Sequence, residues 1–145
     1  MVFQPRITAS IWRRLFIFQA DSPDTINLGG YVPNINNNAD FNGDGKYYLA
    51  NQSLSLNTTY IVSFRKYGTT GQIYLNGALA SYGVGVGWTY SDLGSGEFTL
   101  FGFGGASGTG NYEGYFCEMI GYNGDTSNRR DSINRYLSNK WGVSI

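Results

Sequence analysis

Short runs of aromatic and β-branched residues, divided by glycine-rich turn signals, fill most of this 145-residue chain and constrain its fold most strongly. The chain has 21 glycines, 12 tyrosines and nine phenylalanines, and few strong helix formers before residue 127. Aromatic and β-branched side chains favour strands, and glycine favours the tight turns between them. We therefore predict an all-β protein forming one domain over residues 1–145, because this length and a hydrophobic content of 41% suit one globular core.

The predicted strands are short and follow one another with turn signals between them. Gly68-Thr69-Thr70-Gly71 is typical of a hairpin, and Asn76-Gly77 is the dipeptide best suited to a type I′ turn. The expected strands are 7–19 (one bent strand or two), 46–50, 59–67, 72–76, 78–82, 84–90, 98–103 and 115–122. Four alternate residues of the last strand are expected on one face: Phe116, Glu118, Ile120 and Tyr122. About eight to ten strands fit a two-sheet antiparallel sandwich.

The end of the chain has the pattern of an amphipathic helix, which we predict over 127–141 as a helix that docks on the sheets. Its apolar stripe consists of Ile133, Tyr136, Leu137 and Trp141. Thr126 or Ser127 is expected to cap the first turn with a side-chain oxygen. Gly142 is expected to end the helix in the left-handed conformation.

Several of these segments resemble concanavalin A-like (laminin G-like) lectin domains. The strand 112–122, followed by a helix ending Tyr136-Leu137-Ser138-Asn139-Lys140-Trp141-Gly142, is similar to the end of such domains. The segments 59–64 and 71–77, and then 98–102 and 114–118, are similar to their preceding strands, with Glu118 where the family often carries a strand glutamate. The resemblance covers about residues 59 to 142 and implies a jelly-roll sandwich. It also implies a bacterial surface or bacteriophage virion protein.

Charge and composition restrict the partners of the chain. Ten basic and ten acidic residues give a formal net charge of zero, so we do not expect nucleic acid binding. The first 19 residues contain an apolar run that is broken by Arg13 and Arg14, which predicts neither a signal peptide nor a membrane span. We therefore expect synthesis in a host cytoplasm. Cys117 is the only cysteine and is expected to be a small buried hydrophobe.

Catalytic chemistry is not expected from this sequence. The chain contains no histidine, so Cys117 has no imidazole to activate it. Glycan hydrolysis needs two carboxyl groups on either side of one bond. Glu113 and Glu118 are expected on opposite faces of a strand, and Asp92 and Glu97 flank a Gly-Ser-Gly turn. We therefore predict that the protein is not an enzyme and requires no cofactor.

The segment Asp40-Phe41-Asn42-Gly43-Asp44-Gly45 matches the start of a calcium loop, with Asp40, Asn42 and Asp44 as ligands. The twelfth position of such a loop is Asn51, where a bidentate glutamate belongs. Asp-Gly is also ordinary turn chemistry. Two interpretations therefore stay open, a structural turn and a Ca²⁺ site.

A glycan site needs an exposed aromatic platform beside amide or carboxylate groups. The candidates for such a platform are Tyr47, Tyr48, Trp88, Tyr90 and Tyr112. Most of them are expected to pack in the core or across strands, because small sandwiches bury most of their aromatic residues.

Together these observations suggest a non-enzymatic module of a bacteriophage virion surface, such as a capsid decoration protein or a tail-fibre domain. Its expected partners are other virion proteins or further copies of itself, as a homo-oligomer. Residues 1–20 are predicted to form either an assembly arm or a strand, with Met1 to Ile17 as the assembly contact. The alternative is a carbohydrate-binding, lectin-like module, in a calcium-dependent form if the loop at Asp40 holds a cation. Its ligands would be host-surface glycans.

Overall fold

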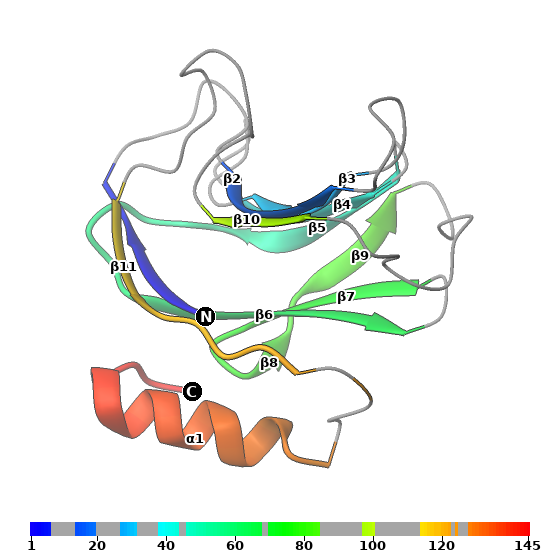
Figure 1. Ribbon diagram of the computed structural model, residues 1–145. Helices are drawn as coiled ribbons and strands as arrows, with labels where there is room; N and C mark the ends of the chain where they lie inside the picture. The colour runs from blue at the N-terminus through cyan, green and yellow to red at the C-terminus, as the bar shows by residue number, and fades with distance from the viewer. Residues whose placement is uncertain are drawn as a thin grey trace.

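The computed structural model describes residues 1–6, 14–19, 27–31, 38–43, 46–67, 70–84, 97–100, 114–122, 124 and 128–145. The chain is mostly β, with an antiparallel sheet of five strands and a short C-terminal helix. An antiparallel sheet of six strands lies over one face of the five-stranded sheet, and the helix lies against the other face (Figure 1). The predicted β-rich chain with a C-terminal helix is confirmed at this level.

The N-terminal strand has an inner position in the five-stranded sheet. Its order is β11-β1-β6-β7-β8. The strands are β1 (Val2–Pro5), β6 (Tyr60–Tyr67), β7 (Thr70–Leu75), β8 (Ala78–Leu79) and β11 (Gly114–Glu118). Because β1 pairs with β6 on one side and with β11 on the other, the start of the chain joins two segments that are far apart in sequence.

The six-stranded sheet has the order β10-β2-β3-β4-β5-β9, and all its neighbouring strands are antiparallel. Its strands are β2 (Arg14–Gln19), β3 (Asn27–Tyr31), β4 (Asn38–Gly43), β5 (Lys46–Ser53), β9 (Ser81–Val84) and β10 (Glu97–Leu100). The successive strands β2 to β5 form a meander in which each strand pairs with the next. The expected strands left out residues 20–45, and so the sequence prediction missed β3 and β4.

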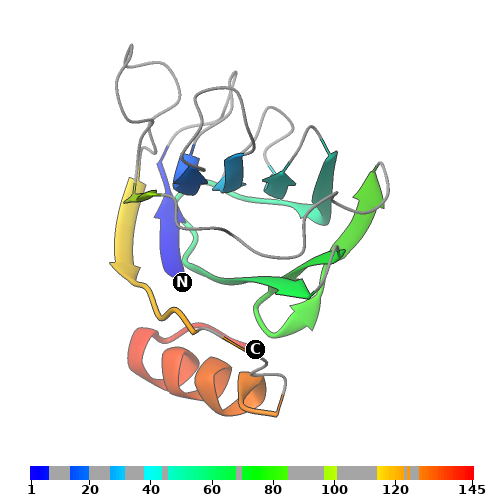
Figure 2. The same ribbon diagram turned by 45° about the vertical axis from the view of Figure 1, so that its right-hand side comes forward.

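Figure 2 shows the helix and the six-stranded sheet on opposite sides of the five-stranded sheet. Each side has its own hydrophobic cluster. The first lies between the two sheets and contains Phe3, Leu15 and Ile73, none of which exposes any surface. The second lies under the helix and contains Val2 and Ile61. Neighbouring residues of a strand point to opposite faces, so Val2 packs toward the helix while Phe3 packs between the sheets. This sheet is therefore apolar on both faces.

The turn predicted at Asn76-Gly77 is confirmed. Both residues have positive φ, 47° and 84°, as a type I′ turn requires, and the turn joins β7 to β8 with Leu75 opposite Ala78. The side-chain oxygen of Asn76 accepts a hydrogen bond of 2.9 Å from the backbone N–H of Ile61. The turn is therefore also fixed to β6. The predicted hairpin around 68–71 agrees with the pairing of Tyr67 with Thr70, although residues 68 and 69 lie outside the described residues.

The helix α1 (Arg130–Trp141) starts later than predicted and uses a different buried face. Its N-cap is Arg129, without a side-chain cap hydrogen bond, so the expected cap at Thr126 or Ser127 is wrong. Its predicted end is confirmed, because Gly142 takes the left-handed conformation with φ 65°. The buried residues of the helix are Asn134 and Leu137, with Ile133 partly buried against the second cluster.

Two predicted faces are corrected by these contacts. Tyr136 was assigned to the buried stripe of the helix, but its side chain is 48% exposed. On the last strand, Phe116 packs against the first cluster and Ile120 against the second, so they do not share one face. The strand β11 ends at Glu118, and its register with β1 shifts between Phe116 and Glu118. Beyond this shift in register, side chains of the segment no longer alternate simply between the two faces of the sheet.

The N-terminal segment 1–20 contains β1 and β2, one in each sheet. Met1, Val2, Phe3 and Pro5 are buried, so these residues belong to the folded body and are not free for an external contact. No helix in the described parts of the chain combines the length and apolar character that crossing a bilayer requires.

Candidate binding site at the C-terminal helix

The predicted glycan residues are only partly within the described structure. Tyr47 and Tyr48 lie in β5, where they pair with Asn42 and Phe41 of β4. Three further candidates lie outside the described residues: Trp88, Tyr90 and Tyr112. The structure therefore places two of the five residues at neighbouring positions of one strand.

The predicted calcium ligands Asp40 and Asn42 lie in β4, two residues apart, and Asp44 lies outside the described residues. The ladder continues to the pair Gly43–Lys46, so residues 40 to 43 are extended and paired with β5. A calcium loop of this type instead curls around the ion through successive ligand positions. Within the described residues, no group of three or more Asp, Glu, Cys or His side chains is arranged to hold a metal. The structural turn and the Ca²⁺ site both stay predictions, because residues 44 and 45 lie outside the described residues.

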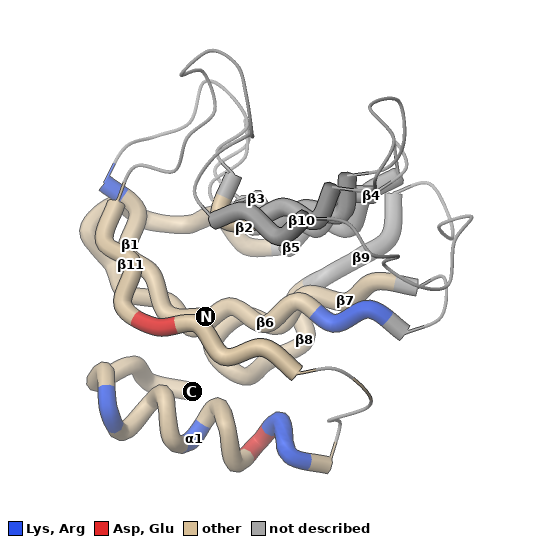
Figure 3. The backbone as a smooth tube through the Cα atoms, in the orientation of Figure 1, with Lys and Arg blue, Asp and Glu red and all other residues tan. Residues whose placement is uncertain are grey.

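Figure 3 shows one acidic position, in red, on β11 and basic positions, in blue, along α1. Glu118, the last residue of β11, contacts the last turns of α1. Its Oε2 accepts a hydrogen bond of 2.8 Å from the indole N–H of Trp141 and lies 3.1 Å from Nζ of Lys140. Its Oε1 accepts a hydrogen bond of 3.2 Å from the hydroxyl of Tyr136. Nζ of Lys140 in turn donates to the Tyr136 hydroxyl oxygen at 3.0 Å. One carboxylate thus receives donors from three helix residues.

The ionisation of this cluster follows from its hydrogen bonds. The bond from Trp141 is the largest cause that lowers the pKa of Glu118, and Lys140 and Tyr136 lower it further. The pKa of Lys140 is raised, first by its bond to Tyr136 and then by Glu118. Each shift favours the charged form, so the pair stays ionised at neutral pH.

This geometry explains the Tyr-Leu-x-x-Lys-Trp-Gly segment in physical terms. Tyr136, Lys140 and Trp141 contact Glu118. Leu137 fills the second cluster with 1% of its surface exposed, and Gly142 ends the helix. The contacts of this segment therefore hold α1 against the sheet.

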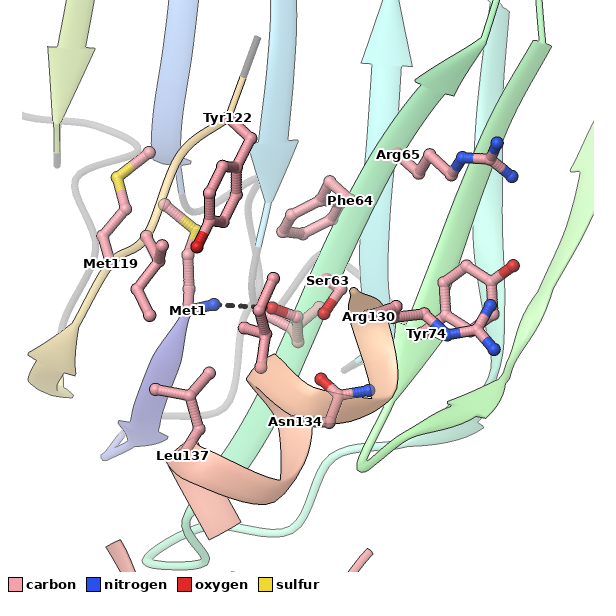
Figure 4. A pocket seen from close by; sticks show the side chains of 13 residues that line it. Met1, Ser63, Phe64, Arg65, Tyr74, Met119, Tyr122, Arg130, Asn134 and Leu137 are labelled. Atoms are coloured by element: carbon pink, nitrogen blue, oxygen red, sulfur yellow. Dashed lines mark hydrogen bonds between the residues drawn. The ribbon is translucent and has the colours of Figure 1, made fainter. Parts of the chain in front are cut away.

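A cavity of about 150 Å³ lies between α1 and β6 (Figure 4). Apolar side chains form most of its wall, among them Phe64, Met119 and Ile133. Its polar lining includes Arg130 and Asn134. Asn134 is 2% exposed, and its Oδ1 atom has no hydrogen-bond partner among the residues that the structure describes. The cavity thus joins an apolar wall to a buried, unpaired acceptor.

Two arginines lie on the same side of this cavity in Figure 4. The guanidinium of Arg130 lies over the ring of Tyr74, 4.4 Å from its centroid, and contacts Asp131 at 3.3 Å. Arg65 Nη1 donates to the side-chain oxygen of Gln72 at 3.1 Å, and the Tyr74 hydroxyl donates to the same oxygen at 3.2 Å. Gln72 therefore fixes the position of both Arg65 and Tyr74.

The amino terminus also lies at the cavity. The α-amino group of Met1 donates a hydrogen bond of 2.8 Å to the carbonyl oxygen of Val62. Burial lowers the pKa of this amine from 8.0 to about 6, although Glu118 acts in the opposite direction. The amine is therefore mainly neutral at pH 7.

Sequence reasoning missed the cavity, although the helix carries a signal for it. Arg130, Asn134 and Leu137 are spaced i, i+4 and i+7, which places them on one helical face. An asparagine on the same face as the buried leucine indicates a polar contact inside. The sequence analysis assigned Tyr136 and Trp141 to the buried face of the helix and so did not consider a buried face that includes Asn134.

Comparison with protein-family models, with curated proteins and with solved structures found no match to this chain. The site must therefore be interpreted from its own residues. Its groups are hydrogen-bond donors and acceptors, two guanidinium groups and apolar walls. These are the elements of a binding site.

Proposed function

We propose that this chain is a non-enzymatic structural and adhesive module of a bacteriophage virion surface, such as a capsid decoration protein or a tail-fibre domain. We further propose that its two sheets form a concanavalin A-like jelly-roll sandwich. The five-stranded and six-stranded sheets, the core between them and the helix on the outer face support this fold. The chain contains no histidine, which supports a function other than catalysis.

The observation that carries the adhesive function is a set of exposed aromatic side chains in the C-terminal third of the chain. They belong to β11, the segment that follows it, and α1: Tyr115 (59% exposed), Tyr122 (54%), Tyr136 (48%) and Trp141 (36%). The strand β11 is at one end of its sheet, and α1 lies beside it (Figures 1 and 2). Tyrosine and tryptophan are enriched at protein interfaces, because they bury a large area with few rotatable bonds. These side chains therefore suit a contact with another virion protein.

The experiment is to purify particles of the phage that encodes the chain and to measure how much of the chain sediments with them. We expect the wild-type chain in the particle fraction, and we expect the double variant Tyr115→Ser, Tyr122→Ser to be lost from it. The matched control is Leu79→Ser, because Leu79 is 56% exposed on β8, at the opposite end of the same sheet. Absence of the wild-type chain from the particles would contradict the proposal.

The alternative is a carbohydrate-binding, lectin-like module. Tyr136 and Trp141 beside Glu118 supply the aromatic and carboxylate groups that sugar recognition uses. Both oxygens of Glu118 are already bonded to helix donors, which weighs against this alternative. A glycan array probed with Ca²⁺ and again with chelator separates the two. Specific binding would support the lectin-like module, and its loss with chelator would support a cation site at Asp40, Asn42 and Asp44. A blank array would remove the alternative.

A further inference from the structure

We propose that the cavity between α1 and β6 binds a small carboxylic acid that has one six-membered ring and a hydroxyl group at the far end of that ring. This inference goes beyond the virion function and does not depend on it. It is supported by the size of the cavity, by the unpaired oxygen of Asn134, and by the arginines on one side. Each of these selects a different part of the ligand.

The size and the wall of the cavity select the ring. A buried apolar cavity of about 150 Å³ is large enough for benzene in an engineered protein. The cavity here has about this volume and is partly open, which leaves room for substituents. Figure 4 shows Met119, Tyr122 and Phe64 toward one side of the cavity. Aromatic and thioether side chains pack well against a flat ring.

Asn134 selects a hydrogen-bond donor. A buried acceptor without a partner costs the fold most of its lost hydration, so native proteins rarely leave one unpaired. Oδ1 of Asn134 is such an atom, and its residue lines the cavity. A ligand hydroxyl placed there would donate the missing hydrogen bond. A purely apolar ligand would leave the oxygen unpaired.

The arginines select a negative charge. Among the described residues, those that line the cavity include Arg65 and Arg130 but no carboxylate. The contacts of Arg130 with Asp131 use Nε and Nη2, and the Asp131 side chain is 72% exposed. Such exposed pairs are weak, and a guanidinium has five N–H groups, so a ligand carboxylate can compete for Arg130. Arg130 and Asn134 are four residues apart on one helical face, which places the two ends of the ligand along the helix.

A sugar fits the same cavity poorly. An acidic sugar also has a six-membered ring and a carboxylate, but it carries several hydroxyl groups. Most of the wall consists of side chains such as Ile120, Ile133 and Leu137, which offer these hydroxyls no partner. Each buried hydroxyl without a partner weakens binding. The apolar wall therefore favours an aromatic acid over a sugar acid.

The first experiment uses the wild-type chain and four matched probes, para-hydroxybenzoate, benzoate, para-hydroxybenzamide and glucuronate. Binding is measured by ligand-observed NMR and by calorimetry. We expect para-hydroxybenzoate to bind most tightly. Benzoate, which lacks the donor, and the benzamide, which lacks the charge, should each bind about three- to tenfold more weakly. Glucuronate should bind least. Absence of binding by all four at millimolar concentration, or tightest binding by glucuronate, would overturn the proposal.

The second experiment locates the site with three variants. Asn134→Leu should abolish the preference for para-hydroxybenzoate over benzoate, while the melting temperature stays equal or rises because an unpaired buried oxygen is removed. Arg130→Gln should abolish the preference for the acid over the amide. Arg135→Gln is the matched control, since Arg135 is exposed on the same helix and does not line the cavity. Equal affinities in all three variants and the wild type would overturn the assignment of the site. The probe comparison on the wild type remains decisive if a variant does not fold.

Discussion

Glu118 links the sheet to the helix through one carboxylate, so its protonation has a consequence for the whole fold. Its pKa is lowered, which means that the folded state favours the ionised form more than the unfolded state does. The carboxylate therefore contributes stability above its usual value of 4.5. That contribution is lost as the pH falls through the lowered pKa of the folded state.

The variant Glu118→Gln tests this contribution. We expect it to melt at a lower temperature than the wild type at pH 7, because a neutral amide cannot form the ion pair with Lys140. The difference should shrink in acid, where the wild-type carboxyl also becomes neutral. Circular dichroism at neutral and acidic pH measures both values. A difference that is the same at both pH values would mean that Glu118 acts through packing alone.

Met1 provides a second titration, in a different pH range. The unfolded amine binds its proton near pH 8.0 and the folded amine only near pH 6, so between these values the unfolded state holds more protons. Stability should therefore fall as the pH is lowered from 8 to 6, by about 2 to 3 kcal/mol in total. It should be level above and below this window. The chain contains no histidine, so no side chain ordinarily titrates in the same window.

Urea unfolding at several pH values between 5 and 9 checks this prediction on chain produced with Met1 as its first residue. The expected signature is a rise of about 1 kcal/mol per pH unit at the steepest point. The folded amine can also be titrated directly by NMR. A flat profile between pH 6 and 8 would show that the amine is not buried as the structure places it.

At the scale of the element, the stability of α1 depends on its C-cap residue, Gly142, as well as on its buried face. Gly142 has φ 65°, and a Cβ placed there would have no heavy atom within 4 Å. The cost of Gly142→Ala is therefore conformational rather than steric, about 1 kcal/mol for an L-residue in the left-handed region. We expect this loss in the free energy of unfolding, measured with urea.

Gly121→Ala is the matched control for this variant. A Cβ at Gly121 also has open space around it, but Gly121 does not have positive φ. Its replacement should be neutral or slightly stabilising, since alanine restricts the unfolded chain. Equal effects of the two substitutions would contradict the role of Gly142 as the helix end.

The same helix shows what sequence can and cannot predict. The turn at Asn76-Gly77 and the helix end at Gly142 were predictable, because each depends on the backbone preferences of one or two residues. The burial of Asn134 and the exposure of Tyr136 were not, because they depend on where β11 ends. Glu118 was singled out by resemblance, but its partners on α1 are 18 to 23 residues away. Local patterns therefore predicted the ends of elements better than their contacts.

At the scale of the whole molecule, the five-stranded sheet packs against both hydrophobic clusters. It therefore couples the unfolding of the six-stranded sheet to that of the helix. Val2 and Phe3 are adjacent in β1, yet one packs under α1 and the other between the sheets. The prediction of an assembly arm or a strand at residues 1–20 did not include this packing, because the pairing of residue 2 with residue 61 is not visible in a local pattern. Undocking of α1 would expose Val2 and Ile61, so the helix and the sheets should unfold together.

Cys117 reports on this coupling, because it packs against the cluster under α1 and is the only cysteine of the chain. Burial raises the pKa of its thiol, which lowers the fraction of reactive thiolate in the folded state. We expect the native chain to react with a thiol reagent far more slowly than the unfolded chain, and Leu137→Ala to accelerate the reaction. Leu137 is fully buried above this cluster, and its truncation should cost about 2 to 5 kcal/mol.

The rate of labelling, compared with global unfolding in urea, then shows how the layers separate. If labelling follows the free energy of unfolding in the wild type, in Leu137→Ala and in the exposed control Arg135→Ala, the helix leaves only when the sheets unfold. Fast labelling of a chain that keeps its full β-sheet signal would instead mean that α1 opens alone. That result would contradict the coupling, because Val2 and Ile61 would then tolerate exposure while β1 and β6 stay paired.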